Sequence, residues 1–220
     1  VPNTIQADMV KGVETPGGRN IAVKPSQVGA SSIIIAWILL DTIFTPGTTS
    51  VIVAHEEFIT QRLLSKAQAF YDSLPEDFRV PMHHKGSHDK SFPDINSVLY
   101  IGSARAYVFG RGERLDNFLA DEYAFWPDTE RIMVPALQRV PPEGRVIVLS
   151  TPNGEDNDFH DLYQEGKSGQ SVWKSHFYPW FVHSEYELRP DSPATLPADQ
   201  GPLSNFTDLE LALTNQGLSE

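Results

Sequence analysis

Two short runs of unbroken apolar residues, Val51–Ala54 and Val146–Leu149, constrain the fold of this chain more than any other feature. A half-exposed strand alternates apolar and polar residues, whereas a strand covered on both faces is apolar throughout. Each run has the length of a strand and is short for a buried helix. The pattern therefore predicts an α/β fold, with a mainly parallel sheet and helices packed on both of its faces.

Strand and helix patterns alternate along most of the chain. Strands are predicted at Asn20–Lys24, Val51–Ala54, Asn117–Ala120, Arg145–Ser150 and Val172–Tyr178, with a strand pair at Val98–Gly102 and Ala106–Phe109. Helices are predicted at Ser31–Phe44, Glu56–Ser73, Asp128–Arg139 and Asp158–Gly166. The stretch before Val98, which contains Pro81 and Pro93, is predicted to be a loop.

The charge of the chain is unevenly distributed. The 220 residues have a net charge of −12, and residues 185–220 carry seven acids, one base and four prolines. We therefore expect residues 1–184 to form the folded domain and residues 185–220 to be an acidic linker or edge segment. Without that segment the charge deficit is halved, so composition neither excludes nor favours a nucleic acid partner.

Composition excludes several classes of site. The chain has no cysteine, which rules out disulfide bonds, cysteine-ligated zinc and thiol catalysis. Its longest apolar run, Ile33–Leu40, is far shorter than a membrane span, so we expect no membrane association. The chain starts at a valine and stops without an obvious ending, and we expect it to be a piece of a longer protein.

A predicted strand and a predicted helix are joined by residues 24–30, which is the setting of a phosphate-binding loop. The usual loop ends in Gly-Lys-Ser or Gly-Lys-Thr. Here Ala30 follows Gly29, and Lys24 stands at the front of the loop instead. Ser31 occupies the position whose hydroxyl would bind Mg²⁺. From this motif alone, a plain strand-to-helix turn with Ser31 as the helix N-cap is an equal alternative.

Asp121 and Glu122 follow a predicted strand, at the edge of a parallel sheet where ligands bind. Asp121 would hold Mg²⁺, and Glu122 would orient and deprotonate an attacking water. Ser150 and Thr151 follow another buried strand, and their hydroxyls would sense the γ-phosphate. Either pair alone could be a solvated turn. The phosphate loop upstream favours the functional interpretation, because these acids need its metal.

Together these motifs resemble the ATPase domain of the large terminase subunit of tailed bacteriophages. The resemblance rests on Lys24–Ser31, Val51–His55, Gly110–Gly112, Asp121–Asp128, Ser150–Gly154 and His176–Trp180, and it covers roughly residues 1–190. Ser26 departs from the family pattern, in which arginine is frequent, and this removes one phosphate contact.

The resemblance implies a P-loop NTPase of the ASCE type that binds ATP and Mg²⁺ and hydrolyses ATP to drive double-stranded DNA into a procapsid. Its implied partners are DNA, the portal protein and the small terminase subunit. A homo-oligomeric ring is implied during packaging, with a monomer as the alternative in isolation. The implied location is the cytoplasm of the infected bacterial host, and not the mature virion. Family members add a nuclease domain after the ATPase, and we expect no nuclease activity from this chain.

The resemblance also implies roles for individual residues. The implied nucleotide contacts are Lys24, Pro25, Ser26, Gln27, Val28, Gly29, Ala30, Ser31, Ser32, Ser150 and Thr151. Gln6 is an implied adenine contact, with an exposed helix residue as the alternative. The implied metal ligands are Ser31 and Asp121, and the implied catalytic residues are Glu122, Lys24 and Arg111. Arg114, Arg105 and Arg139 are the other candidates for the charge-stabilising arginine.

Two other functions stay open. A helicase-like, nucleic-acid-dependent ATPase would share the core and the acidic pair, and strand separation would identify it. A nucleotide-binding assembly module with little hydrolysis is favoured by the missing lysine after Gly29. Glu122 argues against that module, because a protein that only binds ATP needs no base there.

Overall fold

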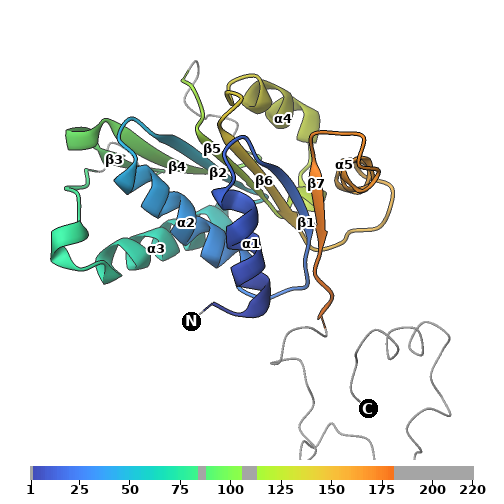
Figure 1. Ribbon diagram of the computed structural model, residues 1–220, viewed down its shortest axis with the longest axis horizontal. Helices are drawn as coiled ribbons and strands as arrows, with labels where there is room; N and C mark the ends of the chain where they lie inside the picture. Colours follow the sequence, from blue (N-terminus) through green and yellow to red (C-terminus); the bar gives the residue numbers. More distant parts are fainter. Residues whose placement is uncertain (1, 84–87, 106–112, 181–220) are drawn as a thin grey trace, which may run out of the picture. The chain divides into compact units, whose positions relative to one another are not determined.

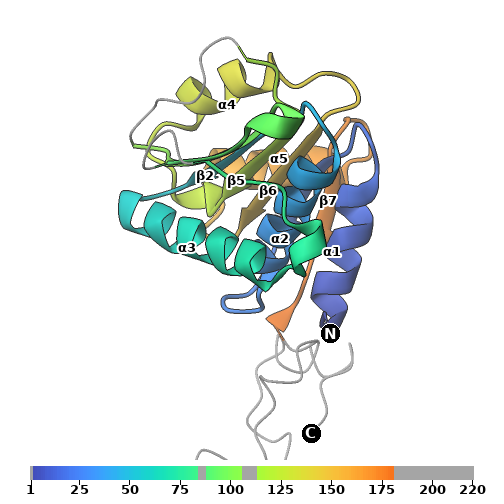
Figure 2. The same cartoon turned by 90° about the vertical axis from the view of Figure 1, so that its left-hand side faces the viewer.

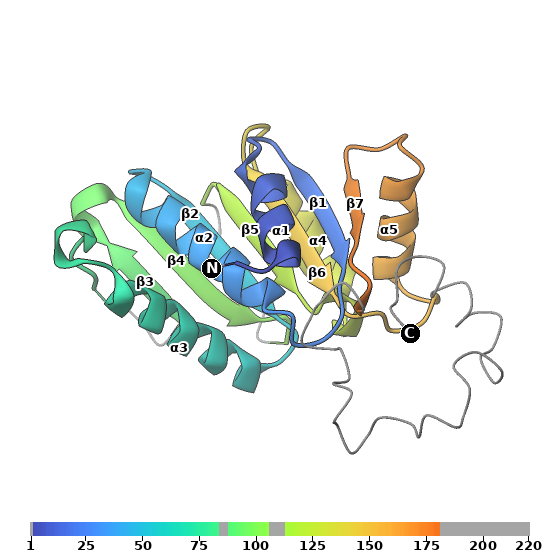
Figure 3. The ribbon, with the colours of Figure 1, turned by 60° about the horizontal axis from the view of Figure 1, so that its bottom comes forward.

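The centre of the fold is a seven-stranded sheet in the order β3-β4-β2-β5-β6-β1-β7. The computed structural model describes residues 2–83, 88–105 and 113–180 (Figure 1). Its strands are β1 (Arg19–Val23), β2 (Thr49–Ala54), β3 (Asp89–Phe92), β4 (Ser97–Ser103), β5 (Asn117–Asp121), β6 (Arg145–Ser150) and β7 (Lys174–Phe177). Neighbouring strands are parallel except β3, which pairs antiparallel with β4. Figure 3 shows the strands side by side in this order.

Helices cover both faces of the sheet, which confirms the predicted fold class (Figure 2). One face carries α1 (Thr4–Glu14), α2 (Ala30–Phe44) and α3 (Glu57–Ser73). The other face carries α4 (Thr129–Leu137) and α5 (Asp158–Lys167). Short 3-10 helices lie at η1 (Glu76–Phe78), η2 (Pro93–Ile95) and η3 (Tyr123–Phe125).

The unbroken apolar run in β2 supplies side chains to two separate cores. Ile52 and Ala54 belong to the core under α1, α2 and α3, whereas Val51 and Val53 belong to the core under α4 and α5. Successive side chains of a strand point to opposite faces, so a strand between two cores must be apolar at every position. β5 and β6 divide their central side chains between the same two cores.

The predicted helices and strands do not include α1 or β3. β3 falls in the stretch predicted to be a loop, because its sequence Asp-Lys-Ser-Phe has no apolar alternation. All four of its residues are nevertheless buried, and the ammonium group of Lys90 donates a hydrogen bond to Gln68 of α3 (2.7 Å). The strand predicted at Ala106–Phe109 lies outside the described residues, and β3 is the antiparallel partner of β4 in the part of the chain that is described.

Two predictions concern the ends and the surroundings of the domain. The acidic segment 185–220 lies outside the described residues, so the domain boundary at residue 184 stays a prediction. Within the described ranges, no helix combines the length and the apolar character that crossing a bilayer requires.

The core that lies under α4 and α5 can be tested at Phe118, a fully buried side chain of β5. Phe118→Ala should lower the free energy of unfolding by about 3–5 kcal/mol, because it removes apolar contacts and leaves a cavity. Phe78→Ala, at a side chain that is 54% exposed, should lower it by less than about 1 kcal/mol. Urea denaturation measures both, and similar losses would contradict the described packing.

Candidate active site

Three adjacent strands end at the candidate site. β6 lies between β5 and β1 in the sheet, and all three are parallel, so their carboxyl ends meet at one edge. β1 leads into Lys24, β5 ends at Asp121, and β6 ends at Ser150. This edge of a parallel sheet is where ligands bind in open α/β folds. The sheet order thus brings together three segments that are far apart in the sequence.

The loop between β1 and α2 has the backbone geometry of a tight strand-to-helix connection. Gly29 is the N-cap of α2 and adopts a left-handed conformation with φ of 73°, and Gln27 is also left-handed, with φ of 58°. α2 therefore begins directly after the loop. The backbone N–H groups of its first turn have no acceptor within the helix, so they favour the binding of an anion. Ser31 is not the N-cap that the alternative interpretation requires; it lies within the first turn of α2.

Lys24 forms an ion pair with Glu122 across the end of β6. The distance from Lys24 Nζ to Glu122 Oε1 is 2.6 Å, and only 5% of the Lys24 side chain and 22% of the Glu122 side chain are exposed. Burial alone would raise the pKa of Glu122, but the Lys24 charge and hydrogen bonds from Lys24 and Thr151 together hold that pKa below its ordinary value. Glu122 is therefore ionised, as a general base must be.

The second oxygen of Glu122 is held by the last residue of β6 and by the residue that follows it. Glu122 Oε2 accepts hydrogen bonds from the backbone N–H of Thr151 (3.0 Å), the Thr151 hydroxyl (3.2 Å) and the Ser150 hydroxyl (3.4 Å). Glu122 itself has φ of 52°, a left-handed backbone conformation that is unusual for a residue with a side chain. Such conformations concentrate at functional sites, where surrounding contacts maintain them.

Asp121 is buried and is hydrogen-bonded to the phosphate loop. The Ser31 hydroxyl donates to Asp121 Oδ1 at 2.7 Å. Burial raises the pKa of Asp121, and the neighbouring Glu122 charge raises it further, against the hydrogen bond from Ser31. A hydroxyl and a carboxylate are hard oxygen ligands that suit Mg²⁺, which commonly takes its other ligands from phosphate oxygens and water. The described residues contain no group of three or more acidic, histidine or cysteine side chains that could hold a metal alone.

The structure separates the candidate arginines. Arg111 lies outside the described residues. Arg105 follows β4 at the edge of the site and is paired with Glu56 at 3.6 Å. Arg114 lies at the amino end of β5, where it donates to Asp116 (2.8 Å) and to Glu143 (2.7 Å).

In its own chain Arg114 therefore lies at the opposite edge of the sheet from Asp121, since β5 runs from that arginine toward Asp121. Arg139 is also at the far edge, because its carbonyl accepts from the N–H of Leu115.

Two residues that lie near the site, Asn3 and His55, were not predicted to be site residues. Asn3 donates to the carbonyl of Val28 in the loop (3.1 Å). His55 follows β2, its ring lies against Phe125 with 6.2 Å between centroids, and its buried Nδ1 has no hydrogen-bond partner among the described residues. The signals in the sequence for His55 are its place after a buried strand and its position at the end of the Val51–His55 match to the family pattern. Gln6, predicted to contact adenine or to be exposed, is half-buried against the loop.

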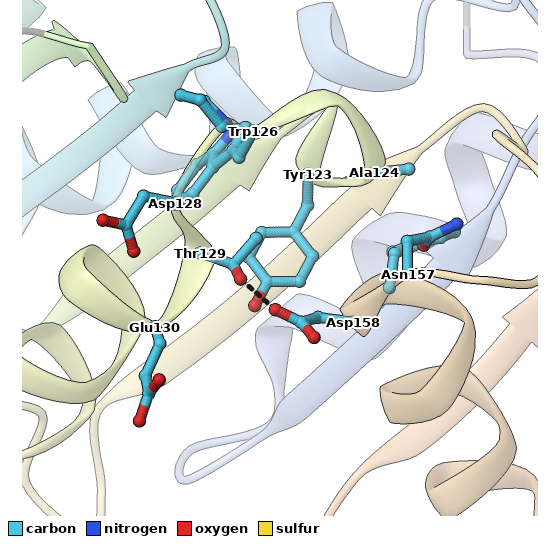
Figure 4. Close-up of a pocket in the computed structure, with 10 residues that line it drawn as sticks. Tyr123, Ala124, Trp126, Asp128, Thr129, Glu130, Asn157 and Asp158 are labelled. Atoms are coloured by element: carbon cyan, nitrogen blue, oxygen red, sulfur yellow. Dashed lines mark hydrogen bonds between the residues drawn. The ribbon is translucent and has the colours of Figure 1, made fainter.

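A cavity of about 400 Å³ lies outside this constellation, between η3 and the first turns of α4 and α5 (Figure 4). Its polar groups have structural roles at those helices. Asp128 accepts from the N–H of Arg131 as the N-cap of α4, and the Thr129 hydroxyl donates to Asp158 of α5. Burial raises the pKa of Tyr123, which lines the cavity, to about 12, so its hydroxyl stays neutral. We therefore do not assign the nucleotide to this cavity.

The buried charge of Asp121 should reduce stability. A carboxyl whose pKa is raised by folding has no such effect below its unfolded pKa of 3.8, and the penalty grows as pH rises through the folded pKa. Asp121→Asn should therefore raise the free energy of unfolding at pH 7, and this gain should disappear below about pH 3.8. Urea denaturation across this pH range measures it, with Asp77→Asn, at an exposed site in η1, as the control. A lower free energy of unfolding for Asp121→Asn at pH 7 would contradict the raised pKa assigned to Asp121.

Comparison with known proteins agrees with the geometry. The sequence model of the terminase large subunit of the T4-like type, N-terminal part, matches residues 21–200. Comparison with curated proteins finds no matching relative.

Several solved structures share the fold. The large terminase of bacteriophage HK97 is 17% identical with a TM-score of 0.66, and the alignment covers 80% of this chain and 39% of that one. The large terminase ATPase domain of Thermus phage P74-26 is 20% identical with a TM-score of 0.56, covering 83% of each chain.

The large terminase of a thermophilic bacteriophage, solved in complex with ADP, is 12% identical with a TM-score of 0.58. That alignment covers 81% of this chain and 45% of the ADP-bound terminase, so this chain spans less than half of that protein and of the HK97 terminase. The family match extends over well more than half of the chain and includes the phosphate loop, the acidic pair and the segment after β6. The chain belongs to the family of N-terminal domains of the T4-like terminase large subunit.

Proposed function

We propose that this chain is a Mg²⁺-dependent ATP hydrolase, the ATPase domain of a packaging motor. The observation that carries the proposal is the convergence of Lys24, Ser31, Asp121, Glu122 and Thr151 at one sheet edge, through hydrogen bonds of 2.6–3.2 Å. These are the parts that phosphoryl transfer to water requires: a cation for the phosphates, ligands for a metal, and an ionised base. An ADP complex of a related terminase supports the choice of nucleotide.

Each of these residues would have its own role in ATP hydrolysis. The loop N–H groups and Lys24 bind the β- and γ-phosphates, and Glu122 orients the attacking water and accepts its proton. Ser31 and Asp121 would hold Mg²⁺, which would neutralise charge on the phosphates. Ser150 and Thr151 would report the state of the γ-phosphate through their bonds to Glu122.

The unusual position of the lysine does not prevent this function. Ala30 occupies the position where the usual loop has lysine, yet Lys24 already reaches the carboxylate of Glu122. ATP would replace Glu122 as the partner of Lys24, which would free the base. Arg111 remains our choice for the charge-stabilising arginine, because it belongs to the Gly-Arg-Gly segment before the acidic strand.

The wider biological role rests on the family. We propose that the complete protein moves double-stranded DNA into a procapsid as a homo-oligomeric ring, with the portal protein and the small terminase subunit as partners. It would act in the cytoplasm of the infected bacterium and would be absent from the mature virion. Nuclease activity is not expected from this chain.

Steady-state ATP hydrolysis with Mg²⁺ tests the proposal. Lys24→Ala should abolish detectable turnover, and Glu122→Gln should lower kcat by about 10²–10⁴-fold, because it removes the base. Arg111→Ala should lower kcat by about 10³-fold or more. The control is Lys167→Ala, at an exposed residue in the last turn of α5, which should leave kcat within about twofold.

Other outcomes identify the alternatives. Turnover that survives in Lys24→Ala would contradict the assigned loop. ATP binding without turnover by the wild-type chain, at concentrations high enough to assemble a ring, would favour the binding module. Strand separation driven by ATP would favour the helicase-like ATPase.

A further inference from the structure

The first turn of α1 packs against the phosphate loop. Asn3 is the N-cap of α1 and forms a reciprocal capping box with Gln6. The N–H of Gln6 donates to Asn3 Oδ1 (2.9 Å), and the N–H of Asn3 donates to Gln6 Oε1 (3.0 Å). The oxygen atoms of both side chains thus satisfy backbone N–H groups at the start of the helix.

The nitrogen atoms of the same two side chains hold the loop. Asn3 Nδ2 donates to the carbonyl of Val28 at 3.1 Å. Gln6 Nε2 donates to the carbonyls of Val28 (3.4 Å) and Gly29 (3.3 Å). An amide side chain carries an acceptor and donors, so one residue can cap a helix and bind a second segment together. A serine–glutamate capping box lacks these amide N–H donors, and its glutamate has none.

The bound carbonyls lie at the point where the loop turns into α2. Gly29 is left-handed and precedes the first helical residue, so its conformation sets the direction of the following N–H groups. A Cβ atom on Gly29 would lie 2.3 Å from Gln6 Nε2. Gly29 is therefore required both for its backbone conformation and for the close approach of the Gln6 amide.

We propose that Asn3 and Gln6 are positioning residues that clamp the phosphate loop in its binding conformation before a ligand arrives. The proposal rests on the proposed function for the identity of the ligand, a nucleoside triphosphate. Gln6 Oε1 accepts a hydrogen bond from the helix cap, and Nε2 donates to two carbonyls of the loop. Through the loop, Gln6 therefore acts on the phosphate half of the ligand.

Two conservative substitutions separate the clamp from the helix cap. Gln6→Glu and Asn3→Asp each retain the oxygen acceptor of the capping box and remove the nitrogen donor to the loop. Thermal unfolding checks that each variant folds, and Asn3→Asp serves if Gln6→Glu does not. Gln164→Glu, an exposed glutamine of α5, is the control for the added negative charge.

The first readout needs no nucleotide. Amide hydrogen exchange at residues 26–30 of the free protein should become about tenfold faster in both variants, because each loses hydrogen bonds that hold the loop. The Gln164→Glu control should exchange like the wild type. Unchanged exchange in the loop of both variants would overturn the clamp.

The second readout compares calorimetric binding of three ligands with Mg²⁺: a non-hydrolysable ATP analogue, its GTP counterpart and inorganic tripolyphosphate. The clamp predicts that Gln6→Glu weakens all three by the same factor, about tenfold, and keeps the ATP:GTP ratio within twofold. Weaker ATP binding with unchanged tripolyphosphate binding would show that Gln6 reads the base, and would overturn the clamp. If wild type binds none of the three, the proposed function fails, while hydrogen exchange still decides the clamp.

Discussion

The ion pair between Lys24 and Glu122 joins two strands that are not neighbours, and the site depends on it. β6 lies between β1 and β5, so Lys24 Nζ must reach across the end of β6 to approach Glu122 within 2.6 Å. The segment after β6 binds the other carboxylate oxygen through Thr151. The Glu122 carboxylate therefore contacts residues at the ends of three strands. A ligand that competes for Lys24 would change the position of this carboxylate, and with it the hydrogen bonds to the segment after β6.

Asp121 and Glu122 are consecutive, yet their pKa values shift in opposite directions. Burial raises the pKa of Asp121, while Lys24 and Thr151 hold the pKa of Glu122 below its ordinary value despite burial. Glu122 thus adds to the free energy of unfolding above its unfolded pKa of 4.5. This contribution is lost as the pH falls through the lower pKa of the folded state. Asp121 subtracts stability wherever its buried carboxyl is ionised. Opposite pKa shifts in two neighbouring carboxyl groups fit the proposed division of roles between a base and a metal ligand.

Much of this arrangement could be predicted from the sequence, because β2, β5 and β6 each contain an unbroken apolar run and the polar motifs come directly after these runs. β3 could not be predicted, since a polar sequence becomes buried there through long-range contacts such as that of Lys90 with Gln68. From the motifs, Lys24 is predicted to bind phosphate and Glu122 to orient water. These predictions do not reveal that the two side chains form an ion pair with each other in the ligand-free protein. The nearness of Arg114 to Asp121 in sequence does not bring it to the site of its own chain, because β5 runs from one toward the other.

A double-mutant cycle on the free energy of unfolding measures the coupling between Lys24 and Glu122 most directly. The nucleotide-free wild type, Lys24→Met, Glu122→Gln and the double variant would be unfolded in urea at pH 7. Each single change leaves a buried charge or dipole without its partner, so the double variant should lose less stability than the two single variants together, by roughly 1–3 kcal/mol. Losses that add within about 0.5 kcal/mol would show that the two side chains are not coupled, and would contradict this account of the site.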